Sequence, residues 1–174
     1  MTVRRAALWI FLFAALAAGG SGLLSCGEAP ERDSPGERSG RLEGRVTKIV
    51  DGDTIHVQVG GRREKVRYIG VDTPETHKPG TPVQCYGRSA SAFNARLVAG
   101  RRVELHTDAE ARDRYGRLLA YVYRRPDGMF VNAELVRRGF ATILTIPPNV
   151  AHAQEFLRLQ RAARQAGRGL WGAC

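Results

Sequence analysis

The sequence is organised around one stretch, Arg67-Tyr68-Ile69-Gly70-Val71-Asp72-Thr73-Pro74-Glu75. Its first half alternates apolar residues with others, which is typical of a strand, and its second half contains a proline, which is typical of a turn. The strand carries one cation, Arg67, and the turn carries two carboxylates, Asp72 and Glu75. The stretch therefore predicts a strand that delivers charged groups to a turn at its end.

Two strands are predicted upstream of this stretch, and the three together indicate an antiparallel meander. In the middle strand Ile55, Val57 and Val59 alternate with polar residues, which is the period of a half-buried strand. Turn signals that contain glycine precede and follow this strand, so the chain reverses direction on both sides. The predicted strands are residues 41–50, 54–59 and 65–71.

Downstream, the sequence predicts three helices, two further strands and an extended segment. The first helix is indicated by an apolar stripe that begins at Tyr86, and it ends at Gly100. Five strands with a helix between the third and the fourth favour a small closed barrel of the oligonucleotide-binding (OB) type, so the fold class is α+β, mainly β, with a five-stranded OB-fold barrel and three α-helices. The strands are expected at 102–107 and 118–123, the other helices at 131–138 and 151–165, and the extended segment at 141–146.

The first 25 residues have the features of a signal peptide. Arg4 and Arg5 precede an apolar run, residues 6–18, that is too short to span a membrane comfortably. The following Leu23-Leu24-Ser25-Cys26 resembles the lipobox of bacterial lipoproteins, in which the cysteine carries a lipid. We therefore expect an exported protein that is either anchored to the membrane through Cys26 or secreted after cleavage nearby.

The remaining chain divides into a flexible tether at 26–40, rich in Gly, Pro and Ser, and one domain at 41–174. If Cys26 is lipidated, Cys85 and Cys174 remain as an even pair in an oxidising compartment. A disulfide between them would tie the C-terminal tail to the start of the first helix. Two unpaired thiols are the alternative, because sequence alone does not show proximity.

The chain is strongly basic, with a formal net charge of +10 and a pI near 10.4. Removal of residues 1–25 takes away two arginines and no acid, so the domain and tether keep a charge of +8. Clustered cations bind phosphate chains by releasing counterions, which favours a polyanionic partner. Charge alone does not distinguish nucleic acid from anionic lipid or acidic polysaccharide.

Four carboxylates lie in two turns that the meander would bring together: Asp51 and Asp53 in one, Asp72 and Glu75 in the other. Acids at such positions also cap turns without any further function. Several oxygens at one point nevertheless repel one another unless a cation lies between them, and oxygen ligands favour calcium or magnesium. A zinc site is not predicted, because no His/Cys cluster has suitable spacing.

Two arginines lie in otherwise strand-like segments, Arg67 and Arg117. Solvated arginines are abundant in this chain, but a guanidinium inside an apolar segment needs an anionic partner, and its planar fork matches phosphate oxygens. Phosphoryl transfer requires charge neutralisation, a metal and a group that orients or deprotonates water. The arginines together with the carboxylates meet these requirements.

At these residues the sequence resembles the thermonuclease family, the staphylococcal-nuclease-like proteins. The resemblance runs from about residue 46 to residue 171, and its pieces have the order and spacing of the family. It implies a five-stranded OB barrel with three helices, in agreement with the strand and helix pattern. The pieces are residues 51–54, 67–76, 86–87, 113–121 and 131–137.

The resemblance also implies roles for individual residues. Asp53 and Asp72, with the backbone carbonyl of Thr73, are similar to the family's Ca²⁺ ligands. Glu75 matches the residue commonly assigned as the general base. The other matches are Arg67 and Arg117 to the two arginines that bind the scissile phosphate, Asp51 to an acid near the metal, and Tyr115 and Lys78 to substrate-binding positions.

The function implied is Ca²⁺-dependent hydrolysis of DNA and RNA to products with a 3′-phosphate, and a monomer is the default expectation for the oligomeric state. One departure concerns the two tyrosines that line the family's nucleotide site, since Thr145 and Pro147 align with them here. Base stacking is then expected to be weaker or supplied differently.

Two alternative functions are a catalytically silent nucleic-acid-binding module of the same fold and an envelope protein whose positive charge binds anionic lipid. Presence of all the acids and arginines favours the enzyme.

Overall fold

The computed structural model describes residues 40–76, 80 and 82–174. The predicted signal peptide, the tether up to residue 39 with Cys26, and Lys78 lie outside the described residues. Within the described ranges, none of the helices is both long enough and apolar enough to cross a membrane.

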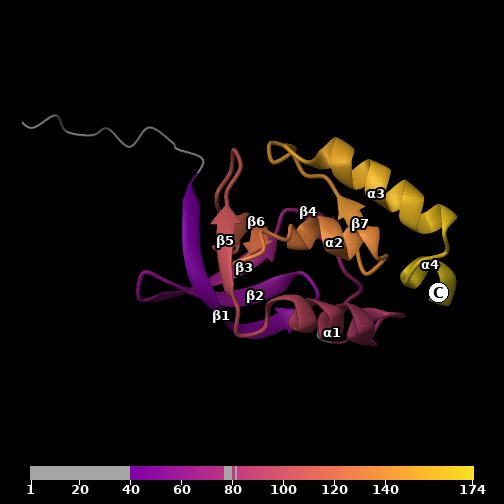
Figure 1. Cartoon of the computed structure of the whole chain (residues 1–174), viewed down its shortest axis with the longest axis horizontal. Helices are drawn as coiled ribbons and strands as arrows, with labels where there is room; N and C mark the ends of the chain where they lie inside the picture. Colours follow the sequence, from indigo (N-terminus) through magenta and orange to yellow (C-terminus); the bar gives the residue numbers. More distant parts are fainter. Residues whose placement is uncertain (1–39, 77–79, 81) are drawn as a thin grey trace, which may run out of the picture. The chain divides into compact units, whose positions relative to one another are not determined.

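Five strands form a closed barrel in the order β1-β2-β3-β6-β5 (Figure 1). Strands β1, β2 and β3 are the predicted antiparallel meander, and β5 pairs antiparallel with both β1 and β6. A parallel pairing of β3 with β6 closes the barrel. This architecture confirms the predicted five-stranded α+β barrel. The strands are β1 (Arg41–Asp51), β2 (Thr54–Val59), β3 (Arg62–Tyr68), β5 (Arg102–His106) and β6 (Leu118–Arg124).

Three helices of ordinary length accompany the barrel: α1 (Gly87–Val98), α2 (Val131–Arg137) and α3 (Ala153–Gln165). Helix α1 packs against β1, whereas α2 packs against β6 and α3 packs on α2 (Figure 1). A short fourth helix, α4 (Leu170–Ala173), was not predicted. Its four residues are too few to produce an apolar periodicity that a sequence pattern could show.

The predicted single strand at 65–71 is wrong in one respect, because it is two strands. Strand β3 ends at Tyr68, and β4 (Gly70–Asp72) pairs with β7 (Thr142–Leu144) outside the barrel. Gly70 has a φ of 78°, and a Cβ added to it would lie 2.4 Å from the ring of Phe156 in α3. The chain therefore turns sharply where a glycine permits both the positive φ and the close approach of the ring.

The Gly70→Ala variant is expected to be destabilised by at least about 2 kcal/mol, because a positive φ costs a residue with a Cβ about 1–2 kcal/mol and the collision with Phe156 adds to it. Gly128→Ala is the matched control, since Gly128 also has a positive φ, 68°, but has open space around it. Chemical unfolding of both variants would separate the two effects. Equal losses of stability would contradict a contribution from the Phe156 contact.

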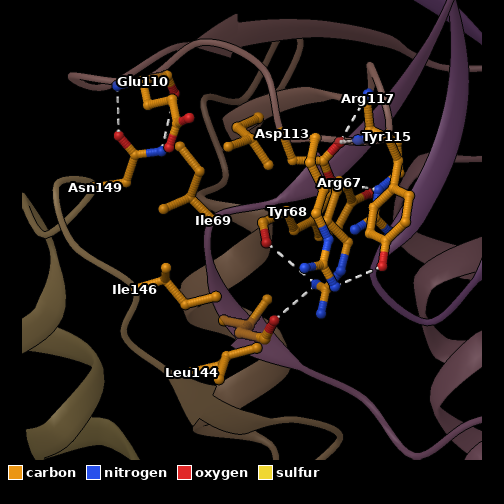
Figure 2. Close-up of a pocket in the computed structure, with 13 residues that line it drawn as sticks. Arg67, Tyr68, Ile69, Glu110, Asp113, Tyr115, Arg117, Leu144, Ile146 and Asn149 are labelled. Carbon is orange, nitrogen blue, oxygen red and sulfur yellow. Dashed lines mark hydrogen bonds and ion pairs between the residues drawn. The ribbon is translucent and has the colours of Figure 1, made fainter.

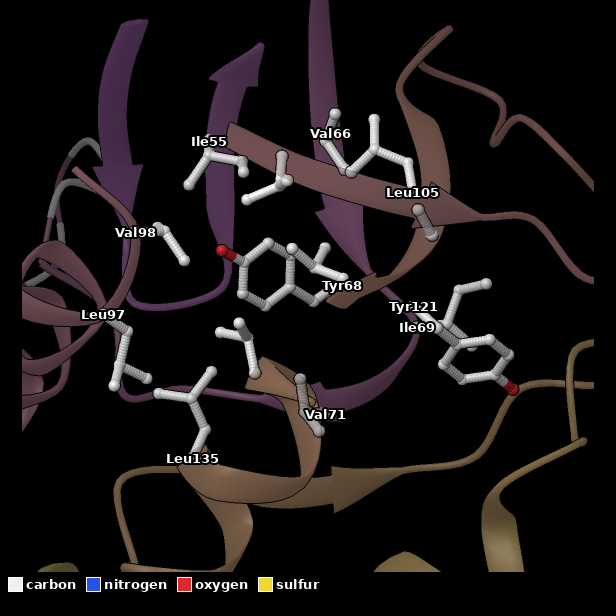
Figure 3. Close-up of a cluster of buried hydrophobic side chains, with 14 of the residues drawn as sticks. Ile55, Val66, Tyr68, Ile69, Val71, Leu97, Val98, Leu105, Tyr121 and Leu135 are labelled. Carbon is white, nitrogen blue, oxygen red and sulfur yellow. The ribbon is translucent and has the colours of Figure 1, made fainter. Parts of the chain in front are cut away.

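The barrel interior is a continuous apolar core that includes Ile55, Val66 and Leu105 (Figure 3). Tyr68 is buried in this core, and its hydroxyl donates a hydrogen bond of 3.0 Å to Oδ1 of Asn94 in α1. Burial raises the pKa of Tyr68 far above its ordinary value, so the phenol remains a donor. The Asn94 Nδ2 in turn donates to the carbonyl oxygen of Asp51, at 3.0 Å. The core thus connects through α1 to the first acidic turn.

A second buried asparagine, Asn132 in α2, holds the corner between β3 and β4. Its Nδ2 donates to the carbonyl oxygen of Ile69 at 2.9 Å, and its Oδ1 accepts from the N–H of Val122 at 3.0 Å. A buried polar group that is fully hydrogen-bonded favours one arrangement of the surrounding elements. Asn132 therefore helps to set the direction in which the stretch from Gly70 onward leaves the barrel.

Cys85 and Cys174 form a disulfide, with Cα atoms 6.1 Å apart. It ties the end of the chain to the segment before α1, as the sequence predicted for the even pair of cysteines. The bond joins residues 89 positions apart and so restricts the unfolded chain strongly.

Reduction of this bond is expected to lower the free energy of unfolding by about 2–4 kcal/mol and to lower the melting temperature accordingly. Thermal unfolding of the protein with and without reductant would measure the effect, and a Cys85→Ser/Cys174→Ser variant should be insensitive to reductant. Alkylation of both cysteines in the native, unreduced protein would contradict the bond.

Candidate active site

Asp53 holds the two acidic turns together. Its Oδ2 accepts hydrogen bonds from the backbone N–H and the hydroxyl of Thr73, at 2.8 and 2.9 Å, and its Oδ1 accepts from the hydroxyl of Thr54, at 3.0 Å. Gly52 is in close contact with Thr73, because a Cβ on this glycine would lie 2.7 Å from the Thr73 hydroxyl oxygen. The predicted meeting of the two turns is therefore a packed, hydrogen-bonded contact, and the Asp53 carboxylate is buried within it.

Asp51 makes a second connection between the same turns. Its Oδ1 accepts hydrogen bonds from the Thr76 hydroxyl, at 2.9 Å, and from the N–H of Gly52, at 2.8 Å. The Asp51 carboxylate thus caps its own turn, as expected of an Asp-Gly sequence, and also binds Thr76, the residue that follows the stretch from Arg67 to Glu75.

Arg67 lies between two of the carboxylates and is largely buried, with its side chain 13% exposed. Its Nη2 is 2.7 Å from Oδ1 of Asp72, and its Nη1 is 3.2 Å from Oδ2 of Asp53. Nη1 also donates to the carbonyl oxygen of Val71, at 2.7 Å. The anionic partner that a guanidinium in an apolar strand requires is thus provided by the protein itself.

Arg117 reaches the same region from the loop before β6, and Asp113 holds it there. The Arg117 Nε donates to Oδ2 of Asp113 at 2.7 Å, while Oδ1 of Asp113 accepts from the N–H groups of Tyr115 and Arg117, both at 3.0 Å (Figure 2). Although burial acts to raise the pKa of Asp113, these hydrogen bonds lower it below its ordinary value. Asp113 is therefore a charged positioning residue. It lies in the matched piece 113–121, and its role was not predicted from the sequence.

The two arginines differ in what they can offer to a ligand. Within the described residues, the terminal nitrogens Nη1 and Nη2 of Arg117 have no hydrogen-bond partner, whereas both terminal nitrogens of Arg67 are bonded to the protein. A guanidinium with free terminal nitrogens is suited to bind phosphate oxygens in a bidentate manner. Arg117 is thus available directly, and Arg67 would have to share or exchange its carboxylate contacts.

A small cavity of about 190 Å³ brings the predicted catalytic residues to one place. Glu75, Arg67 and Arg117 line it together, although they come from three separate segments of the chain. Lys65 also lines it and was not predicted as a site residue; its position two residues before Arg67 on a strand was the available signal. The complete lining is Val50, Asp51, Asp53, Thr54, Lys65, Arg67, Glu75 and Arg117.

Two carboxylates in and beside this cavity, Glu75 and Asp72, have a raised pKa. The pKa of Glu75 is raised by burial and then by the negative charges of Asp51, Asp53 and Asp72. Burial likewise raises the pKa of Asp72, with a further contribution from Asp53, while the charge of Arg67 opposes the shift. Excess negative charge thus accumulates here despite the arginines, and a cation would relieve it.

The donor set is compatible with a hard divalent cation, because every candidate ligand is an oxygen: the carboxylates of Asp53 and Asp72 and the carbonyl of Thr73. In the ranges that the structure describes, no three His, Cys, Asp or Glu side chains are grouped closely enough to hold a metal by themselves. Carbonyl oxygens and water would therefore complete the coordination, as is common for calcium. Oδ1 of Asp72 is engaged by Arg67, so its other oxygen is the better placed to take part.

A larger cavity of about 470 Å³ adjoins the first and shares Arg67 and Arg117 with it (Figure 2). Tyr115, which is 68% exposed, stands at this cavity, where its ring lies 5.5 Å from the guanidinium carbon of Arg117. On the β7 side the lining consists of Leu144 and Ile146, both exposed. Thr145 and Pro147, the positions aligned with two tyrosines, are not among its lining residues, so aliphatic rather than aromatic side chains cover this wall.

Comparison of the sequence with known proteins points to one family. The family model described as staphylococcal nuclease homologue matches residues 65–173. A thermonuclease of Staphylococcus intermedius is 44% identical over 126 residues, which are 72% of this chain and 74% of that protein. Endonuclease YncB of Bacillus subtilis is 40% identical over 128 residues, which are 72% of this chain and 60% of that protein. The matched region includes the stretch from Arg67 to Glu75 and the Asp113–Arg117 loop, and the chain belongs to the staphylococcal nuclease homologue family.

Proposed function

We propose that the protein is a calcium-dependent nuclease that hydrolyses phosphodiester bonds of DNA and RNA and leaves 3′-phosphate ends. That it is a nuclease, a hydrolase of the phosphodiesterase type, follows from its family and from relatives named thermonuclease and endonuclease. The proposal adds three points to this: the metal is calcium, the products carry a 3′-phosphate, and the arginines stabilise the transition state. The observation that carries it is the presence of Arg67, Glu75 and Arg117 around one small cavity beside Asp53.

The proposed reaction is an attack of water on the phosphorus atom. As the new P–O bond forms, a proton passes from the water to the Glu75 carboxylate, whose raised pKa suits a general base. The bond from phosphorus to the 5′-oxygen of the next nucleotide breaks, and that oxygen takes up a proton. The products are a 3′-phosphate and a 5′-hydroxyl.

Arg67 and Arg117 stabilise the negative charge that develops on the phosphate oxygens in the transition state. Arg117 binds one edge of the phosphate through its free terminal nitrogens, while Asp113 keeps the side chain in place. Asp53, Asp72 and the Thr73 carbonyl are the residues that would hold calcium. When bound, the ion would polarise the phosphate and lower the pKa of a coordinated water.

We further propose that the protein acts outside the cytoplasm, either secreted or anchored through Cys26. The sequence of residues 1–25 supports this, and so does the Cys85–Cys174 disulfide, because such bonds persist in oxidising compartments. A monomer would suffice for the proposed chemistry, since one chain supplies every group.

The experiment that tests the function is cleavage of single-stranded DNA, duplex DNA and RNA by the purified protein in calcium, in magnesium and in a calcium chelator. Cleavage that requires calcium, yields 3′-phosphate ends and is lost in Asp53→Asn is the expected result. Salt-sensitive DNA binding without cleavage under any metal would support the silent binding module instead. Cleavage that persists in the chelator would contradict the metal requirement.

A further inference from the structure

Three basic side chains form a row across the outer face of the barrel, next to the proposed catalytic groups. The strand register places Lys48 of β1 opposite His56 of β2, and His56 opposite Lys65 of β3. Ile55, Val57 and Val66, their neighbours along the strands, point into the core, so the row faces outward. We call Lys48, His56 and Lys65 the cationic row.

The row directly adjoins the catalytic groups. The next row on the same face of these strands consists of Asp51, Thr54 and Arg67, which are also opposite one another, and of these Thr54 and Arg67 are largely buried. On β2 and β3 the two rows are two residues apart, about 6.6 Å, and on β1 Asp51 lies three residues after Lys48, beyond a register irregularity, so the two rows are near neighbours. Lys65 belongs to the cationic row and also lines the small cavity with Arg67, Glu75 and Arg117. The surface is therefore continuous from the cavity to Lys48.

The charge of the row is not balanced by the protein. Among the described residues, neither Lys48 nor Lys65 forms an ion pair, and the same is true of Arg63, which lies two residues before Lys65 on the outer face of β3. Elsewhere arginines do find carboxylates, as Arg112 does with Glu64. His56, and not a carboxylate, lies between the two lysines, so the charges of Lys48 and Lys65 are left for an external anion to balance.

The pKa of His56 reflects the positive charge of the side chains around it. Its Nδ1 is buried and has no hydrogen-bond partner in the described structure. Burial lowers the pKa of His56, and the charges of Arg63, Lys48 and Lys65 lower it further. The imidazole is therefore neutral at pH 7, and the two lysines with Arg63 carry the charge.

We infer that the cationic row binds the phosphates adjacent to the scissile phosphate, so that one strand of the nucleic acid crosses β3, β2 and β1 after it leaves the small cavity. The inference rests on the proposed function for the scissile phosphate. Neighbouring strands lie about 4.8 Å apart, so the row extends about 10 Å from β3 to β1. A chain of phosphates is the anion that can occupy the cavity and the row at the same time, whereas an isolated phosphate fills only one of them.

The salt dependence of binding tests this inference. Binding of a single-stranded oligonucleotide would be measured in a metal chelator, so that the proposed hydrolysis does not occur, at salt concentrations from 50 to 200 mM. The loss of two phosphate contacts in Lys48→Gln/Lys65→Gln should reduce the salt slope by about 1.4, which makes the affinity ratio between these two concentrations about sevenfold smaller. Melting temperatures would verify that the variant folds.

The matched control is Arg158→Gln/Arg161→Gln, which removes the same charge from the exposed face of α3, where these arginines form no ion pair in the described structure. Its salt slope should remain that of the unmodified protein. Equal slopes for the unmodified protein and both double variants would overturn the inference. Equal reductions in the two double variants would overturn it as well, because only the net charge would then matter.

A second measurement uses the unmodified protein and does not depend on any variant. In an NMR titration, saturation with the oligonucleotide should raise the pKa of His56, since bound phosphates would offset the charges of Lys48, Lys65 and Arg63. His106, which pairs with Glu104 on β5, serves as the internal reference. An unchanged His56 titration would overturn the inference. Absence of cleavage in every metal would instead refute the proposed catalysis. The binding results would still show whether the cationic row binds phosphates.

Discussion

The Arg117→Ala variant is expected to lose about 10³–10⁵-fold in kcat, the range found for arginines that stabilise the transition state of phosphoryl transfer. The physical reason is that Arg117 is held by Asp113 through its Nε, while its terminal nitrogens have no partner in the described part of the protein. They are therefore free to bind the phosphate oxygens as charge develops there. The side chain is 27% exposed, so its removal should leave the fold intact.

Single-turnover cleavage at saturating substrate and metal would measure this loss, and thermal unfolding would confirm that the variant is folded. Arg112→Ala is the matched control, because Arg112 lies in the same loop but binds Glu64 at the surface, with Nη1 2.9 Å from the Glu64 Oε2. We expect that control to cleave at nearly the rate of the unmodified protein. If Arg117→Ala cleaved as fast as Arg112→Ala, the proposed role of Arg117 would be wrong.

The Glu75→Gln variant is expected to lose about 10²–10⁴-fold in kcat, which is the usual contribution of a general base. Glutamine has nearly the same shape but does not accept the proton of the attacking water. Glu75 lines the small cavity, and its backbone N–H donates to Oε1 of Gln84 at 2.9 Å. This backbone contact is kept in the variant, so the turn should retain its conformation.

Calorimetry would establish whether Glu75→Gln still binds calcium, which separates a loss of the base from a loss of the metal. The control is Glu155→Gln in α3, whose carboxylate pairs with His152, with Oε2 2.9 Å from Nδ1. A Glu75→Gln variant that binds calcium and cleaves at an undiminished rate would show that another group accepts the proton.

Much of the barrel could be predicted because its signals are local. Ile55, Val57 and Val59 alternate with polar residues, and glycines mark the turns, so the meander of β1, β2 and β3 follows from the sequence pattern. The candidate ligands and catalytic residues could likewise be named from their chemistry and from the family motifs. Their partners could not be named, because an ion pair such as Arg67–Asp53 depends on two strands that meet in space.

The break between β3 and β4 shows where local patterns fail. The apolar alternation continues through Ile69 and Val71, which predicted one strand, but the chain turns at Gly70 to accommodate the ring of Phe156. The residue responsible lies 86 positions further along the sequence. The only local sign of such a contact is a glycine, and glycines occur in sequences for many other reasons, so the contact cannot be predicted from the sequence.

By itself, the sequence determined most of the segments that become strands and helices, which side chains carry charge, and the family to which the chain belongs, since each of these depends on residue type and spacing. Only the tertiary structure decided which of these groups meet. It closed the barrel by a parallel pairing of β3 with β6, paired Cys85 with Cys174, and brought Glu75 and Arg117 to one cavity. The reason is that such contacts join residues far apart in the chain, and their formation depends on the packing of the whole core rather than on any local preference.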